Sequence, residues 1–346
     1  MVNGDRVRQA RELRDLTQAA LASRLDVNQS TAASIESGRH HPSPELALSI
    51  AIHTGFPLSF LNQDSPEDFP VGSHLLFRAR ASMSARQKAQ VHRYAQTIFE
   101  CSSKLSRRVT SISPRIPQLP SESPVMAADA TRSALGLSPD TPIADLLFSV
   151  EKAGVVILSL PIIQPNIEAF SLWAGPNQEK PVISILPQMP GDRLRFSVAH
   201  ELGHLVLHRT LKGEFPELER EANEFAGSLL LPEGPMREEL NPPITLSTLA
   251  QLKPRWGVSI QSLIMRASEL GILNERQKRY LFQQMSTRGI RKREPASLDI
   301  PLERPRGLRQ MAELVCGVPI DYRRLSREVY LPETFLRETM GCYRDN

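Results

Sequence analysis

Apolar residues separated by short polar connections dominate the first 62 residues. From Val7 to Leu13 they recur every three to four positions, which is typical of the buried face of a helix. Thr17 and Asn28 each precede a further periodic run, where their side chains can cap a helix N-terminus, and Gly38 can end the second run. The pattern predicts a domain of short helices over residues 1–62.

The next part of the chain changes in character twice. Residues 84–108 form a long basic helical pattern, preceded by a polar, proline-containing link over residues 63–83. Residues 111–124 hold four prolines and several serines, which is typical of a boundary between domains. We therefore expect a basic helical linker over residues 63–124 that ends in a Pro/Ser-rich segment.

From residue 125 the pattern mixes helical and strand-like runs. Short apolar runs rich in Val, Ile and Phe are typical of strands, and the longer periodic runs are typical of helices. The domain over 125–240 is predicted to be α+β, and the tail over 241–346 to be helical with proline breaks. The pattern predicts helices over 125–135, 142–153, 193–208 and 217–231, and strands over 155–160, 170–173 and 182–186.

Composition places the chain among globular proteins. Its 346 residues suggest two or three compact units, and a hydrophobic content of 40% is enough for real cores. No apolar run approaches the roughly 20 residues that span a bilayer, and the charged N-terminus lacks the apolar stretch of a signal peptide. The three cysteines are widely spaced and form no CxxC pair. We therefore expect a cytoplasmic protein without a membrane segment.

The net charge of +4 is unevenly distributed. Residues 1–62 balance six arginines with six carboxylates, whereas residues 63–116 carry nine Lys/Arg against four Asp/Glu. A second basic run extends from Arg288 to Arg293. Such runs usually mark solvated faces, and a phosphate or partner contact is the alternative.

A short motif inside an apolar helical run carries the clearest chemistry. His200 and His204 are four residues apart, so both imidazoles project from one helix face and can reach one tetrahedral metal ion. Glu201, beside the first histidine, can hold and deprotonate a water molecule. Because these groups would be costly to bury unpaired, a metal site is favoured over a satisfied polar core cluster. The motif predicts the zinc-binding and catalytic core of a metallopeptidase.

The third protein ligand has to come from another segment. Position 210, six residues after the second histidine, is Thr210, so the metzincin arrangement is absent. The helix predicted over 217–231 supplies several carboxylates. Glu221 borders the buried stripe of this helix and is the expected ligand, with Glu219 and Glu224 left open as alternatives.

These segments resemble a known family of zinc proteases. RFSVAHELGHLVLH followed by EREANEFAGSLLLP resembles the ImmA/IrrE metallopeptidases of the gluzincin type, and LLFSVEKAGVVILSLPI, AFSLW and LKPRWGVSIQSLIMRASELGIL extend the resemblance over about residues 125–295. The resemblance implies Zn²⁺ held by His200, His204 and Glu221, with Glu201 as the catalytic residue. It also implies endopeptidase cleavage of a DNA-bound repressor, a point on which spacing and composition are silent.

The first 62 residues also resemble a known family. The run LTQAALASRLDVNQSTAASIESGRHHPSPELALSIA is similar to Cro/C1-type (XRE) helix-turn-helix domains. The resemblance implies that Gln29, Ser30 and Ser34 contact bases of double-stranded DNA, while Gln18 bridges to phosphate or base. Such domains often pair on symmetric sites, which makes a homodimer an expectation. The zero net charge keeps a protein-interaction domain of the same fold as the alternative.

The expected fold is therefore multidomain: an all-α helix-turn-helix domain, a long helical linker, an α+β zincin-like peptidase domain of the gluzincin type and a helical C-terminal region. The predicted function is a DNA-binding transcription or stress regulator with zinc-dependent endopeptidase activity against a partner repressor protein. One alternative is a non-enzymatic regulator whose peptidase-like domain senses a ligand. The other is an antitoxin-like protein that also binds a partner toxin.

Overall fold

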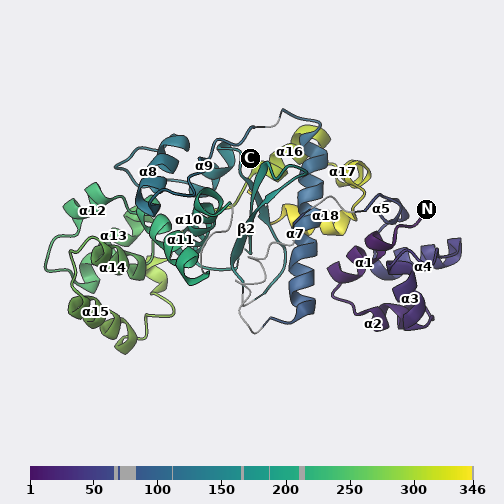
Figure 1. The fold of residues 1–346 in the computed structure, drawn as a ribbon, viewed down its shortest axis with the longest axis horizontal. Coiled ribbons are helices and arrows are strands. Elements are labelled where there is room, and N and C mark those ends of the chain that lie inside the picture. The colour runs from purple at the N-terminus through teal and green to yellow at the C-terminus, as the bar shows by residue number, and fades with distance from the viewer. Residues whose placement is uncertain are drawn as a thin grey trace.

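The structure is a computed structural model of the chain, and it describes residues 1–65, 69–70, 83–110, 112–164, 167–186, 188–209 and 215–344. The molecule is elongated, with the N-terminal helices at one end, a small sheet in the middle and the helices of residues 233–287 at the other end (Figure 1). Within the described part of the chain, no helix is long and apolar enough to cross a membrane. Most of the predicted polar link over 63–83 lies outside the described residues.

Residues 1–65 form a bundle of short helices. Thr17 caps the second helix, because its hydroxyl accepts a hydrogen bond of 3.1 Å from the Ala20 N–H. Arg11 binds both carboxylate oxygens of Glu36, at 2.5 and 3.0 Å, and so joins the first helix to the third. The helices are α1 (Gly4–Leu13), α2 (Gln18–Arg24), α3 (Gln29–Glu36), α4 (Pro44–Thr54) and α5 (Leu58–Leu61).

A three-stranded sheet lies at the centre of the molecule, in the order β1-β3-β2. Its strands are β1 (Val156–Ser159), β2 (Ala169–Ala174) and β3 (Lys180–Ile185), each within two residues of a predicted strand. Strand β1 runs parallel to β3, and β2 runs antiparallel to β3 with Ser171 opposite Ile183. Because the side chains of a strand alternate between the two faces, each apolar strand contributes to two separate cores.

One face of the sheet packs against the helices that follow the predicted linker. Ile157, Ala169 and Ile183 point into this core, and the Pro/Ser-rich segment lines it, because the Leu119 N–H donates to the Val206 carbonyl at 2.9 Å. Its helices are α8 (Pro124–Ala134), α9 (Leu146–Lys152), α10 (Gly191–Leu207), α11 (Phe215–Leu230), α12 (Glu233–Glu239), α13 (Leu246–Trp256), α14 (Ile260–Glu269) and α15 (Glu275–Thr287), with a 3-10 turn η1 (Ala296–Leu298) after them.

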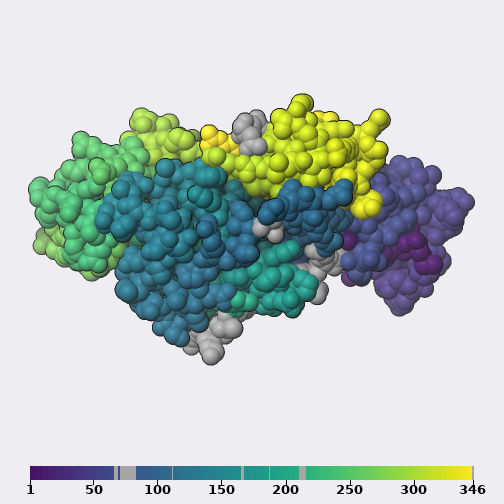
Figure 2. Space-filling view, turned by 90° about the horizontal axis from the view of Figure 1, so that it is seen from above, coloured from purple at the N-terminus to yellow at the C-terminus, as the bar shows by residue number. Residues whose placement is uncertain are grey.

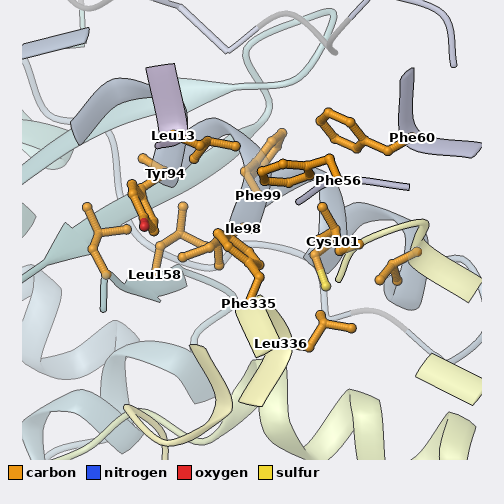
Figure 3. Packing of buried hydrophobic residues seen from close by; sticks show 14 of the residues in the cluster. Leu13, Phe56, Phe60, Tyr94, Ile98, Phe99, Cys101, Leu158, Phe335 and Leu336 are labelled. Carbon is orange, nitrogen blue, oxygen red and sulfur yellow. The ribbon is translucent and has the colours of Figure 1, made fainter. Parts of the chain in front are cut away.

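The opposite face of the sheet packs against α7 (Ala85–Ser106) and the C-terminal helices α16 (Gly307–Cys316), α17 (Tyr322–Val329) and α18 (Glu333–Met340). Figure 3 shows Phe56 of the N-terminal domain, Tyr94 and Phe99 of α7, Leu158 of β1 and Phe335 of α18 gathered in a single core. The ring of Phe335 stacks on Tyr94 with centroids 5.6 Å apart. The N-terminal domain is therefore packed onto the rest of the molecule through α7 and α18.

Helix α7 is largely buried, which differs from the solvated basic linker that its charge suggested. Arg6 of α1 donates a 2.7 Å hydrogen bond to Glu100 of α7, and both side chains are buried. Arg93 of α7 forms a second ion pair, at 2.6 Å, with Glu12 of α1. Ion pairs between α1 and α7, with charges of both signs on α7, therefore hold the N-terminal domain in place. The divisions at residues 62, 124 and 240 stay predictions, since one core includes residues from all four segments.

Candidate metal centre

Two close approaches fix the helix that carries the metal motif. Gly191 starts α10 against the backbone of the C-terminal segment, where an added Cβ would lie 2.4 Å from the Ile300 carbonyl oxygen. Gly203 allows α11 to approach, because a Cβ there would lie 2.9 Å from Cδ1 of Phe225. Because Gly203 has no side chain, α11 packs closely against α10, and the polar residues at the start of α11 lie next to the motif.

Two histidine nitrogens and one carboxylate converge between α10 and α11. Nε2 of His200 lies 3.1 Å from Nε2 of His204, and Oε1 of Glu219 lies 3.1 Å from the latter nitrogen. The second oxygen of Glu219 is 3.5 Å from Nε2 of His200. Zinc–nitrogen bonds of about 2.0–2.1 Å in a tetrahedron place ligand atoms roughly 3.3 Å apart. The spacing and the chemistry of the three donors therefore fit a zinc ion.

The structure places Glu219, not Glu221, against the two histidines. Glu221 instead lies with its Oε2 2.9 Å from Nε2 of His208. Both glutamates reach the row of histidines on α10, but Glu219 contacts His200 and His204, whereas Glu221 contacts His208. We expected Glu221 to be the third ligand, whereas the structure places Glu219 next to His200 and His204. Glu224 lies near Arg220, at 3.4 Å.

Each motif histidine is oriented through its other ring nitrogen. Nδ1 of His200 donates to Oδ1 of Asn223, at 2.8 Å. Nδ1 of His204 lies 2.9 Å from Nδ1 of His208, the residue that ends α10. Both contacts leave Nε2 directed to the metal position, as outer hydrogen bonds commonly do at metal sites. Sequence reasoning missed Asn223, although its place one turn after Glu219 on the same face is a usable signal.

Glu201 is buried beside the two histidines and is held from the sheet. The hydroxyl of Ser171, on β2, donates a 2.7 Å hydrogen bond to Oε2 of Glu201. Two residues further along the same face of β2, Nε1 of Trp173 donates to the Leu205 carbonyl at 3.3 Å. Strand β2, which is at an edge of the described sheet, is thus anchored along α10. No sequence signal pointed to Ser171, because its role arises only when β2 meets α10.

The N-terminal domain presents its expected DNA contacts on two helices. Gln29 and Ser30 are exposed at the start of α3, and Ser34 is half-buried one turn later. Gln18, at the start of α2, donates a 2.8 Å hydrogen bond to Oε2 of Glu36. The same carboxylate is bound by Arg11, so Gln18 is tied to the α1–α3 junction.

The fold and this arrangement define a helix-turn-helix protein that carries a metallopeptidase-type domain. Residues 7–61 match the family model of a helix-turn-helix, and residues 150–268 match that of the IrrE N-terminal-like domain, in peptidase family M78. No curated protein matches the sequence. The chain thus combines an XRE-type helix-turn-helix domain with an IrrE/ImmA-like domain, which confirms both resemblances.

Proposed function

We propose that this protein is a cytoplasmic regulator that binds DNA through residues 7–61 and cleaves a partner repressor as a zinc-dependent endopeptidase. The observation that carries the proposal is a buried glutamate, Glu201, which directly follows His200 of the His200, His204 and Glu219 donor set and is held by the Ser171 hydroxyl. A structural metal site needs no carboxylate held ready next to its ligands. A hydrolytic site needs one to move a proton.

The zinc ligands in this proposal are His200, His204 and Glu219. Asn223 and His208 fix the two imidazole rings, so that little ordering is left to occur when the metal binds. A zinc ion held by these groups supplies a Lewis acid that polarises the carbonyl of the scissile peptide bond. Glu221 supports the site indirectly, through its contact with His208.

Glu201 acts as the general base and then as the general acid. Its carboxylate takes a proton from the attacking water and passes that proton to the amine of the departing peptide. Ser171 holds one carboxylate oxygen of Glu201 through its hydroxyl, which fixes the plane of the group. Ser171 is therefore a positioning residue of the proposed reaction.

Strand β2 supports an extended substrate. It is an edge strand of the described sheet, and Ser171 links it directly to Glu201. A peptide that pairs with this strand by backbone hydrogen bonds would pass along the metal site. The nature of the substrate, a repressor protein bound to DNA, is supported by the helix-turn-helix in the same chain and by the family likeness.

DNA binding rests on the two helices of the N-terminal domain. In the proposal, Gln29, Ser30 and Ser34 of α3 contact base edges in the major groove, and Gln18 of α2 bridges to phosphate or base. A pair of chains on a symmetric site is part of the proposal. Its test is the mass of the protein–operator complex, which should contain two copies.

The experiment for the enzyme is the Glu201→Gln variant, co-expressed with helix-turn-helix repressors of the same cell. Because the amide keeps its shape but takes up no proton, the variant should hold about as much zinc as the wild type and cleave nothing. Glu224→Gln, a half-buried change on the same helix as Glu219, is the matched control and should cleave normally. Equal cleavage by wild type and Glu201→Gln would overturn the catalytic role.

A further inference from the structure

The two basic runs of the sequence differ in how their charges are used. Those of the first run, around α7, are largely bound within the molecule: Arg86 pairs with Asp15 at 2.7 Å, Arg93 with Glu12, and Arg108 with Glu328 at 2.9 Å. The first two pairs join α7 to the N-terminal domain, and the third joins Arg108, just after the end of α7, to α17. The ion pairs of the described part of the first run are therefore explained by packing within the chain.

The second run is part of a larger basic segment at the other end of the molecule. Residues 275–293, which comprise α15 and the turn after it, contain seven basic side chains and one carboxylate, that of Glu275. The segment thus has a formal surplus of six positive charges, more than the +4 of the whole chain. The basic residues are Arg276, Lys278, Arg279, Arg288, Arg291, Lys292 and Arg293.

These charges are exposed and have few partners within the protein. Lys278 pairs with Glu275 at 2.7 Å. Among the described residues, this is the single ion pair that any member of the segment forms. Arg276, Arg279, Arg288 and Arg293 are exposed and take part in no ion pair with the described part of the chain. A segment with this surplus of exposed positive charge attracts anionic partners.

Helix and turn meet at one hollow. A concavity of about 470 Å³ is lined by residues of both, and the guanidinium of Arg291 lies over the ring of Phe282, 5.1 Å from its centroid. This contact folds the turn back along α15. Arg276 and Arg288 are twelve residues apart, so the basic groups at the start of α15 and those after its end are separated by about 18 Å along the helix axis. Tyr280 adds an aromatic side chain that is 60% exposed.

We propose that α15 and residues 288–293 form a second DNA-binding surface, which contacts the phosphate backbone of double-stranded DNA without reading its sequence. The surface lies at the opposite end of the molecule from the helix-turn-helix (Figures 1 and 2). Five of the seven basic residues are arginines, whose planar guanidinium suits phosphate oxygens. An acidic protein is less favoured, because protein interfaces are usually anchored by buried apolar groups and Tyr280 is the one large exposed apolar side chain of the segment.

The test uses the full-length protein and a fluorescein-labelled 30-base-pair duplex of arbitrary sequence, titrated at several salt concentrations. The patch variant changes Arg276, Arg279, Arg288 and Arg293 to Gln, which leaves the contacts of Lys278 and Arg291 intact. Each phosphate contact contributes about 0.9 to the slope of log affinity against log salt. The variant should therefore bind at least tenfold more weakly than the wild type near 50 mM salt and lose about 3 to 4 from the slope.

The control variant changes four exposed arginines that already have surface ion pairs, Arg193, Arg220, Arg237 and Arg337, to Gln. Its net charge equals that of the patch variant, so it should keep most of the affinity and slope if location matters. Equal binding by the two variants would overturn the proposal. A second result would also overturn it: the wild type binds polyglutamate as tightly as the duplex, and the patch variant loses both to the same extent. That result would assign the surface to acidic proteins.

A further variant separates this surface from the helix-turn-helix. Gln29→Ala with Ser30→Ala should leave the salt slope on arbitrary duplex nearly unchanged, because these side chains carry no charge. If the salt dependence were lost in this variant and retained in the patch variant, the proposal of a second DNA-binding surface would be contradicted. A failure of the patch prediction would leave operator recognition by α3 untouched, so the two proposals stand or fall separately.

Discussion

The hydroxyl of Ser171 on β2 donates a 2.7 Å hydrogen bond to Oε2 of Glu201 on α10, inside the protein. This bond connects an edge strand of the described sheet to the motif helix at the residue expected to move protons. Neither atom of this hydrogen bond belongs to a metal donor, so removal of the bond can be distinguished experimentally from loss of the metal.

The first prediction concerns this bond. Ser171→Ala should lower kcat by about 10- to 100-fold, because a hydrogen bond to a charged group contributes about 1.5–3 kcal/mol. Zinc content should stay the same and Ser171→Thr should recover part of the rate. The matched control is Ser184→Ala, a buried change on β3. An equal loss in both variants would mean that the sheet, and not the hydrogen bond, was disturbed.

The second prediction separates two neighbouring glutamates. Glu219→Gln should lose zinc on dialysis, because a ligand charge is removed, whereas Glu221→Gln should keep the metal with an affinity lowered about 10- to 100-fold at most. Metal content after dialysis against a graded chelator measures both. Retention of zinc by Glu219→Gln together with complete loss by Glu221→Gln would return the third ligand to Glu221.

The third prediction concerns the packing of α1 on α7. Arg6 and Glu100 form a buried ion pair, so Arg6→Met leaves a buried carboxylate uncompensated and should lower the free energy of unfolding by about 3–5 kcal/mol. Adding Glu100→Gln should restore a large part of this loss. Urea unfolding followed by circular dichroism provides the measurement, and a double variant as unstable as the single one would contradict the pairing.

The fourth prediction is a pH dependence of stability. Glu151 accepts hydrogen bonds from the N–H groups of Arg306 and Gly307, and burial raises the pKa of its carboxyl from 4.5 to about 7. Because the pKa of this carboxyl is higher in the folded protein than in the unfolded chain, the free energy of unfolding is highest below pH 4.5, where Glu151 is protonated in both states. It falls as the pH rises toward 7, by up to about 3 kcal/mol.

The matched variant for this titration is Glu151→Gln, which cannot ionise. The free energy of unfolding of the wild type, relative to that of the variant, should therefore decrease from pH 4.5 to pH 8. Urea midpoints in one buffer series at constant ionic strength measure that difference. A constant difference across the series would show that Glu151 titrates at its ordinary pKa.

The sequence predicted the local elements of the fold well. Each strand of the sheet was found from its short apolar run, because β-branched and aromatic residues are enriched in strands: Val and Ile in β1 and β3, Phe and Trp in β2. The α10 motif was also visible, because the spacing of His200 and His204 is a property of one helix. Both predictions depended only on neighbours along the chain.

The missed features all depend on contacts between distant segments. The side of α11 that meets α10 is set by the approach of Gly203 to Phe225, so helical periodicity alone could not choose between Glu219 and Glu221. Helix α7 carries enough charge to look solvated. Its partners lie in α1 and α17, far along the chain, and only the fold brings them together.

The shared core around α7 has a consequence for any target bound to the same DNA. A helix of 22 residues, about 33 Å long, packs against both the DNA-reading domain and the sheet beside the metal site. In the proposed function, the distance between the bound DNA groove and the candidate metal site is therefore fixed by the fold. Operator spacing, and not only peptide sequence, would decide which neighbouring protein comes within reach.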